Sequence, residues 1–180
     1  MTKTPLFAAM MLVGVAGAAH AGGSPGTIGV GAEYQLSGVG GASMNYDGGD
    51  WHAGGALGFR DGGGRGDDTI WQLGGRFFYH VHSTTDADFS VGGSVGILNI
   101  PIGGGDDFTG IYLEPGIQIR LFLAANVAFS VSTGIVLALS DADGVGISGS
   151  TLAGAQSVGL TTDGFGFSFG GGAGLHYYFF

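Results

Sequence analysis

Histidine side chains recur at positions from which two rings could hold one ligand. His80 and His82 are two residues apart, which places both on one face of an extended strand. Neutral imidazoles paired in this way are common metal ligands. His52 and His176 occupy the same polar face of their own segments, but we expect no carboxylate at their level. We therefore predict a hydrogen-bonded plug inside the protein, with no metal and no cofactor, formed by His52, His80, His82 and His176.

Charged residues in the middle of the extended segments are the second group with chemical potential. They all fall on the polar face of their segments and include both signs, so they can neutralise one another across a narrow interior. Unpaired buried charges would be costly, whereas a satisfied network is tolerated. We interpret the group as a structural charge network rather than a solute-binding site. Its members are Glu33, Arg60, Arg76, Glu114 and Arg120.

Other reactive patterns are weaker. Asp106-Asp107 and the DADG segment at 141–144 could bind a divalent cation, but they lack the ligand number of a calcium loop, and turn aspartates are the simpler explanation. Hydrolysis at the outer surface would need a serine and a histidine together near an acid. Every histidine is expected to point inward, and HVHS at 80–83 is only a weak match. We therefore predict that the protein is not an enzyme.

The segments that must position these residues alternate between apolar and small or polar side chains. In residues 27–36, for example, Ile28 and Val30 share one face, while Gly29 and Gly31 share the other. This period of two is typical of a β-strand with two different environments. Eight such segments follow one another: 27–36, 41–46, 51–60, 70–82, 88–98, 110–122, 126–139 and 165–179.

Charge placement separates a membrane barrel from a soluble sandwich. The apolar face of these segments carries no charge, and we place every aspartate in or beside a turn. The other face is mostly Gly and Ser with a few charges, as expected for a confined interior. This pattern predicts an all-β, closed antiparallel up-and-down transmembrane β-barrel of eight strands. Two segments leave the number of strands open, since 37–50 could be a single loop and 140–164 could add a hairpin; a soluble secreted sandwich is the remaining alternative fold.

The N-terminus indicates export. Residues 1–21 combine Lys3, an apolar run from Leu6 to about Ala19, and a small-residue site at Ala19-His20-Ala21. These are the parts of a cleaved signal peptide, so we expect residues 22–180 to form one barrel domain. The full chain has five basic and fourteen acidic residues, which makes nucleic acid a poor partner because little neutralises phosphate. If both termini are periplasmic, the expected periplasmic turns are short and most outer loops are longer.

The C-terminal segment ends in GLHYYFF, and here the chain resembles small outer-membrane barrels of the OmpA/OmpX type, which end in alternating aromatic residues and a final Phe. The resemblance covers roughly residues 26–180. In that family the terminal strand is recognised by the barrel-assembly machinery, which implies an assembly signal here at Leu175, Tyr177, Phe179 and Phe180. The implied location is the bacterial outer membrane, with membrane lipid and lipopolysaccharide as neighbours.

These observations predict a monomeric integral outer-membrane protein with a structural or surface role and a largely plugged lumen. Two alternatives stay open. One is a narrow channel for small solutes, and the other, which we favour less, is an enzyme that modifies lipid A.

Overall fold

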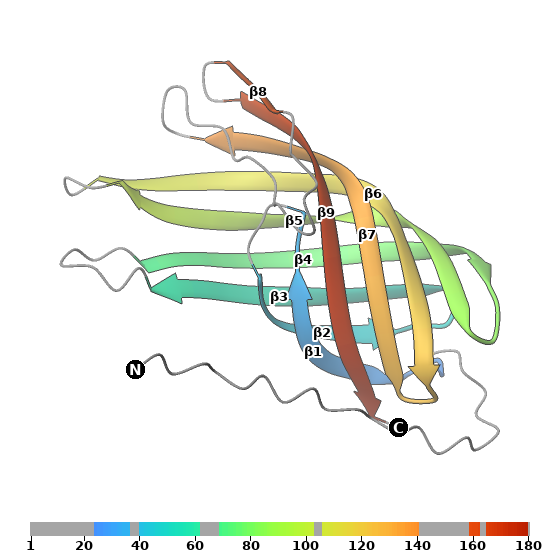
Figure 1. Cartoon of the computed structure of the whole chain (residues 1–180). Coiled ribbons are helices and arrows are strands. Elements are labelled where there is room, and N and C mark those ends of the chain that lie inside the picture. Colours follow the sequence, from blue (N-terminus) through green and yellow to red (C-terminus); the bar gives the residue numbers. More distant parts are fainter. Residues whose placement is uncertain are drawn as a thin grey trace, which may run out of the picture.

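The computed structural model describes residues 24–36, 40–61, 69–102, 106–140, 159–162 and 165–179. Almost all of them lie in strands (Figure 1). The strands are β1 (Ile28–Tyr34), β2 (Gly40–Asp47), β3 (Trp51–Asp61), β4 (Thr69–Ser83), β5 (Ala87–Ile102), β6 (Asp106–Ala124), β7 (Val127–Ser140), β8 (Gly159–Thr162) and β9 (Phe165–Phe179). Within these residues no helix is long and apolar enough to cross a membrane.

Eight of the described strands close into one antiparallel barrel. Each pairs with the next along the chain from β1 to β7, β7 pairs with β9, and β9 pairs back with β1. The closing register joins Ile28 to Phe179 and Tyr34 to Ala173. The predicted all-β, closed up-and-down barrel of eight strands is therefore confirmed.

The structure describes part of each of the two segments, 37–50 and 140–164, that left the number of strands open. Residues 40–47 form β2, paired with β1 on one side and β3 on the other, so 37–50 is not a single loop. Within 140–164, the described residues 159–162 form the short strand β8, which pairs only with β9. It lies beside the part of β9 that extends beyond its pairing with β1. β8 therefore extends the sheet beside one end of β9 and is not a ninth strand of the closed barrel.

Three tight turns lie at the same end of the barrel as the C-terminal end of β9, and we call this end the turn end. The turns join β2 to β3, β4 to β5 and β6 to β7. The backbone N–H of Tyr178 donates to the carbonyl of Asn126, which ties the last strand to the β6–β7 turn (Figure 1). In the β2–β3 turn Gly49 adopts a φ of 92°, a conformation that favours glycine. Its N–H donates to Asp47 Oδ1 over 2.9 Å.

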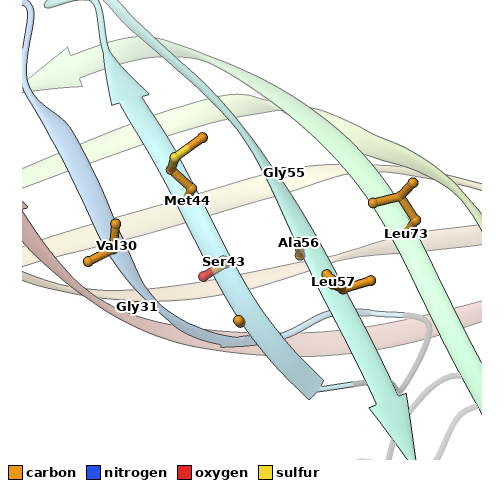
Figure 2. A pocket seen from close by; sticks show the side chains of 9 residues that line it. Val30, Gly31, Ser43, Met44, Gly55, Ala56, Leu57 and Leu73 are labelled. Atoms are coloured by element: carbon orange, nitrogen blue, oxygen red, sulfur yellow. The ribbon is translucent and has the colours of Figure 1, made fainter.

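The alternation of side chains sorts the residues into a buried interior and an exposed exterior. Polar side chains such as Gln72, Arg76 and Glu114 are 6 % exposed or less, whereas Phe59 and Leu73 on the other face are more than half exposed. Figure 2 shows part of the exterior, where apolar side chains stand outward from neighbouring strands. The barrel is thus apolar outside and polar inside, which reverses the arrangement of a water-soluble sandwich.

Proline within β6 fits this architecture because of its place in the ladder. Pro115 pairs with Gly93 of β5, but on the β7 side the pairing passes from Leu113 directly to Gly116. The register between β6 and β7 is the same before and after this gap. Proline has no backbone N–H to donate, and Pro115 lies at a position that is not paired with β7.

Candidate functional site

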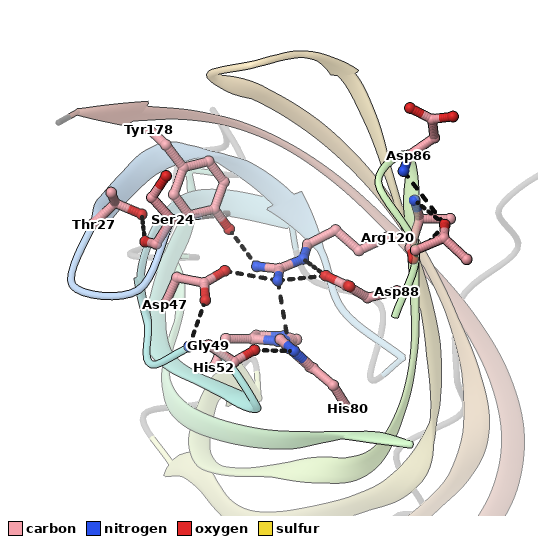
Figure 3. A network of polar contacts seen from close by, with 12 residues as sticks. Ser24, Thr27, Asp47, Gly49, His52, His80, Asp86, Asp88, Arg120 and Tyr178 are labelled. Carbon is pink, nitrogen blue, oxygen red and sulfur yellow. Dashed lines mark hydrogen bonds and ion pairs between the residues drawn. The ribbon is translucent and has the colours of Figure 1, made fainter. Parts of the chain in front are cut away.

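The polar interior of the barrel is the candidate site, and its lowest layer is organised by one guanidinium. We call this layer, at the turn end, the Arg120 cluster (Figure 3). Arg120 donates from Nε and Nη2 to Asp88 Oδ2 over 3.0 and 2.6 Å. Its Nη2 also lies 2.7 Å from Asp47 Oδ2, and its Nη1 donates to the Tyr178 hydroxyl over 3.0 Å. Four strands, β2, β5, β6 and β9, are thereby connected across the lumen. The cluster consists of Asp47, His52, His80, Asp88, Arg120 and Tyr178.

Two histidines of the Arg120 cluster form a directed hydrogen-bond chain. His80 Nδ1 lies 2.6 Å from the Gly49 carbonyl, which can only accept, so this ring nitrogen carries the proton. In the neutral ring, His80 Nε2 then accepts from His52 Nδ1 over 2.8 Å. Arg120 Nη2 lies 3.4 Å from the same nitrogen. The β2–β3 turn is thus joined through the His80 ring to Arg120, and His52 contacts the same ring nitrogen from β3.

Aromatic rings close the same layer. The Arg120 guanidinium carbon lies 4.9 Å from the centre of the Phe122 ring and 5.8 Å from that of Tyr178. The His52 ring stacks on Phe78 with centres 5.4 Å apart. These side chains are 8 % exposed or less. An eight-stranded barrel leaves just enough interior for side chains to fill, and at this level the described residues fill it.

The middle layer of the lumen contains a second guanidinium, Arg76, and we call it the Arg76 cluster. Arg76 forms an ion pair with Glu33 through Nη1. Its Nε donates to Asn45 Oδ1 over 2.8 Å, and its Nη2 lies 3.3 Å from His176 Nε2. Ser43 Oγ lies 2.6 Å from the same His176 nitrogen. β1, β2, β4 and β9 are connected here, so most of the barrel wall is bridged at one level or the other.

The contact between Ser43, His176 and Glu33 brings together the residue types of a hydrolase triad, but not its geometry. A relay needs the acid on one imidazole nitrogen and the serine on the other. Here both approach Nε2, with Ser43 at 2.6 Å and Glu33 Oε2 at 3.9 Å. All three side chains are buried in the lumen. This arrangement supports a hydrogen-bond network rather than nucleophilic attack.

The third layer is uncharged. The Tyr112 hydroxyl donates to Gln35 Oε1 over 2.9 Å and accepts from Gln72 Nε2. Gln72 also donates to Gln35. The Tyr112 ring fits because Gly74 and Gly96 present no side chain, and a Cβ at either position would overlap its hydroxyl. Glycine inside this part of the barrel therefore makes room for one buried aromatic side chain.

The predicted charge network is connected only in part. Glu33 and Arg76 pair with each other, and Glu114 is buried with 1 % of its surface exposed. Arg120 does not join Glu33 or Arg76 in an ion pair but binds two aspartates of its own cluster. Arg60 belongs to β3, and its side chain lies outside the described residues.

The predicted histidine plug separates into two layers and loses one member. His52 and His80 lie in the Arg120 cluster, whereas His176 lies in the Arg76 cluster. His82 is exposed, contrary to the expectation that it points inward. The pairing of β4 with β5 shifts between His80 and His82, and this irregularity changes the face on which His82 emerges.

The expectation that no carboxylate lies level with the histidines is wrong, because Asp47 and Asp88, which lie beside turns as expected, point into the lumen. Both are buried, at 0 and 4 % exposed, and both bind Arg120. A sequence signal existed, because Asp47 continues the inward alternation of Ser43 and Asn45. Their nearness to the turns concealed it.

The remaining predicted residues are partly described. Leu175, Tyr177 and Phe179 lie on the exterior, each more than two-fifths exposed, while Phe180 falls outside the described residues. The Asp106 and Asp107 side chains and residues 141–144 also fall outside them. In the described part of the chain no group of three or more histidine or acidic side chains is placed to hold a metal ion.

Comparison with known proteins gives one structural likeness. The chain is similar to the crystal structure of Neisserial surface protein A, with 14 % sequence identity, 85 % of this chain and 94 % of that chain covered, and a TM-score of 0.43. No protein-family description matches the sequence. No curated protein matches it either.

Proposed function

We propose that the protein is an integral barrel of the bacterial outer membrane, with a structural or surface role and a lumen closed by its polar clusters. The observation that supports this most strongly is the exterior of the closed barrel. Its large side chains are apolar on every strand from β1 to β7 and on β9, and most are 40 to 72 % exposed. In water such a surface would aggregate, whereas in lipid it is the expected outer surface.

Two aromatic pairs mark the two ends of the apolar exterior, and the distance between them gives its height. Phe59 pairs with Trp71 towards one end of the barrel, and Trp51 pairs with Tyr79 towards the turn end. Eight residues separate the pairs along each strand, or about 26 Å at about 3.3 Å per residue. A strand tilt of about 40° reduces this to a height of about 20 Å, near the band of about 25 Å that aromatic girdles flank in outer-membrane barrels.

The lumen supports a structural role because its charges are already engaged with one another. Arg76 and Arg120 each bind carboxylates from other strands, and aromatic rings fill the turn end. We assign no enzymatic reaction, cofactor or metal. We infer that the barrel is a monomer whose partners are outer-membrane lipid, lipopolysaccharide and, during insertion, the barrel-assembly machinery that reads the strand ending at Phe179.

A narrow channel is the second candidate, and one observation favours it. Among the described lumen side chains, the buried carboxylates Glu33, Asp47, Asp88 and Glu114 outnumber the buried guanidiniums Arg76 and Arg120. A pore lined in this way would prefer cations. Planar-bilayer recordings test it: stepwise conductance with a cation-selective reversal potential would favour the channel, and a silent bilayer containing folded barrel would favour the scaffold.

The primary test is the dependence of the fold on an apolar environment. Residues 22–180 refolded in detergent are expected to migrate differently on gels before and after boiling, because a closed barrel resists unfolding by the gel detergent. They should also require detergent or lipid to remain dispersed. A chain that runs as a folded monomer in plain buffer would contradict the proposal.

A further inference from the structure

A groove crosses the exterior of β1 to β4. It has a volume of about 610 Å³. Figure 2 shows its walls, the side chains of Val30, Met44, Leu57 and Leu73, standing on four successive strands. Met44, Leu57 and Leu73 are each more than half exposed. Between these walls the outward positions are held by the small residues Ala42 and Gly55, so the surface is hollowed where its neighbours project.

The groove has little to offer a polar occupant. Ser43 is the one hydroxyl residue of its lining, and its Oγ is bonded to His176 inside the barrel. The backbone polar groups of β2 and β3 are used in ladders on both sides of each strand. An extended peptide therefore finds no free strand edge to pair with. Any occupant with hydrogen-bonding groups would leave them unpaired, which is costly.

The depth of the groove in the proposed membrane also favours an apolar occupant. Met44 pairs with Gly55, and Gly55 pairs with Gly75. The Gly55–Gly75 pair lies midway along the strands between the two aromatic pairs, the level of the bilayer interior in the proposed function. Tight protein interfaces are anchored by aromatic side chains in packed pockets, but on β3 and β4 the aromatic residues stand above and below the groove, not in it.

We propose that this groove binds one acyl chain of a phospholipid as a defined site, more tightly than the surrounding lipid. The inference rests on the proposed membrane location. Met44 contributes an adaptable side chain that can follow the contour of a flexible hydrocarbon chain. Contact with the four walls buries methylene groups that would otherwise meet mobile neighbours.

The test uses the barrel reconstituted in phosphatidylethanolamine bilayers and released into a mass spectrometer under conditions that keep it folded. Wild type should retain a lipid that survives the collision energy at which other lipids are lost. Ala42→Leu places a branched side chain in the groove, which removes packing contacts with the chain, so the lipid should be lost at a lower collision energy than from wild type. Ala53→Leu is the matched control, because Ala53 also faces outward on β3 but does not line the groove.

The outcomes separate the groove from the membrane location. One fewer retained lipid in Ala42→Leu, with Ala53→Leu like wild type, supports the site. Equal retention in all three proteins, or no retained lipid in a wild-type barrel that inserts and shows heat-modifiable migration, overturns the site and leaves the membrane proposal standing. Failure of all three to insert into bilayers would instead overturn the proposed function and, with it, the inference. Retention of a second copy of the chain in place of lipid would show that the groove is a protein interface.

Discussion

At the scale of single residues, the barrel interior depends on the pairing of buried charges. Arg120 contacts two carboxylates, Asp47 and Asp88, that come from different strands. Each of these three side chains is 5 % exposed or less. Burying an ion pair contributes little net stability, but removing one partner leaves the other charged and unsolvated. Arg120 is therefore the side chain whose loss should be felt most strongly.

Replacing Arg120 with Met should lower the free energy of unfolding by about 3–5 kcal/mol, because both aspartates lose their partner. Urea unfolding in detergent micelles, followed by tryptophan fluorescence, measures this change. The triple variant Arg120→Met with Asp47→Asn and Asp88→Asn should recover part of the loss, since no unpaired charge is left. If the single variant were as stable as wild type, the Arg120 cluster would not contribute to holding the barrel together.

At the scale of the strand, β4 shows how adjacent glycines can have different roles. Gly74 faces inward, where a Cβ would overlap the Tyr112 hydroxyl. Gly75 faces outward, and the nearest atom to a Cβ there is the Gly54 carbonyl oxygen at 3.8 Å, an ordinary contact. The first glycine is required by the packing of the lumen, and the second is not required by contacts within the barrel.

Gly74→Ala should destabilise the barrel by about 1–3 kcal/mol, as overpacking of a filled interior does. Gly75→Ala should be neutral or slightly stabilising, because alanine loses less backbone freedom than glycine in a strand. Heating both variants and comparing their folded fraction on gels gives the two values side by side. Similar losses at both positions would mean that the Tyr112 hydroxyl does not pack against Gly74.

Strand alternation explains which features could be predicted and which could not. The pattern of Ala42, Met44 and Tyr46 favours β2 but leaves a single loop over 37–50 open, and the apolar exterior follows from the same period. The inward direction of Asp88 could not be settled, because a residue beside a turn satisfies both the strand pattern and the turn composition. The register of β4 with β5 shifts before His82, and no local sequence preference predicts this irregularity. Asp88 lies opposite Arg120 on the neighbouring strand, but Asp47 and Tyr178 come from strands far apart in sequence, so their contacts with Arg120 depend on the closed barrel.

At the scale of the whole molecule, the exterior should respond to charge according to depth in the bilayer. Leu73 lies on β4 between the aromatic residues Trp71 and Tyr79, whereas Val81 lies beyond them towards the turn end. Both side chains are more than half exposed. The same substitution at the two sites therefore compares the bilayer interior with its edge while keeping the strand and the face constant.

Leu73→Arg should cost more in a lipid bilayer than Val81→Arg, because a lipid-facing Arg costs about 0–1 kcal/mol near the interface and about 2–4 kcal/mol at the midplane, and Leu73 lies between these depths. Denaturant unfolding from phospholipid vesicles measures both. Equal costs at the two depths would argue that β4 does not cross the hydrocarbon region.

The pairing of Ile28 with Phe179 has a consequence for how the molecule comes into being. The first and last strands are as distant in sequence as any two described strands, so their contact carries the largest loop-closure entropy and should form late. Until it forms, β1 and β9 each present a row of unpaired backbone groups that invites aggregation. Before closure both edges of the open sheet stay exposed, so this barrel should fold slowly.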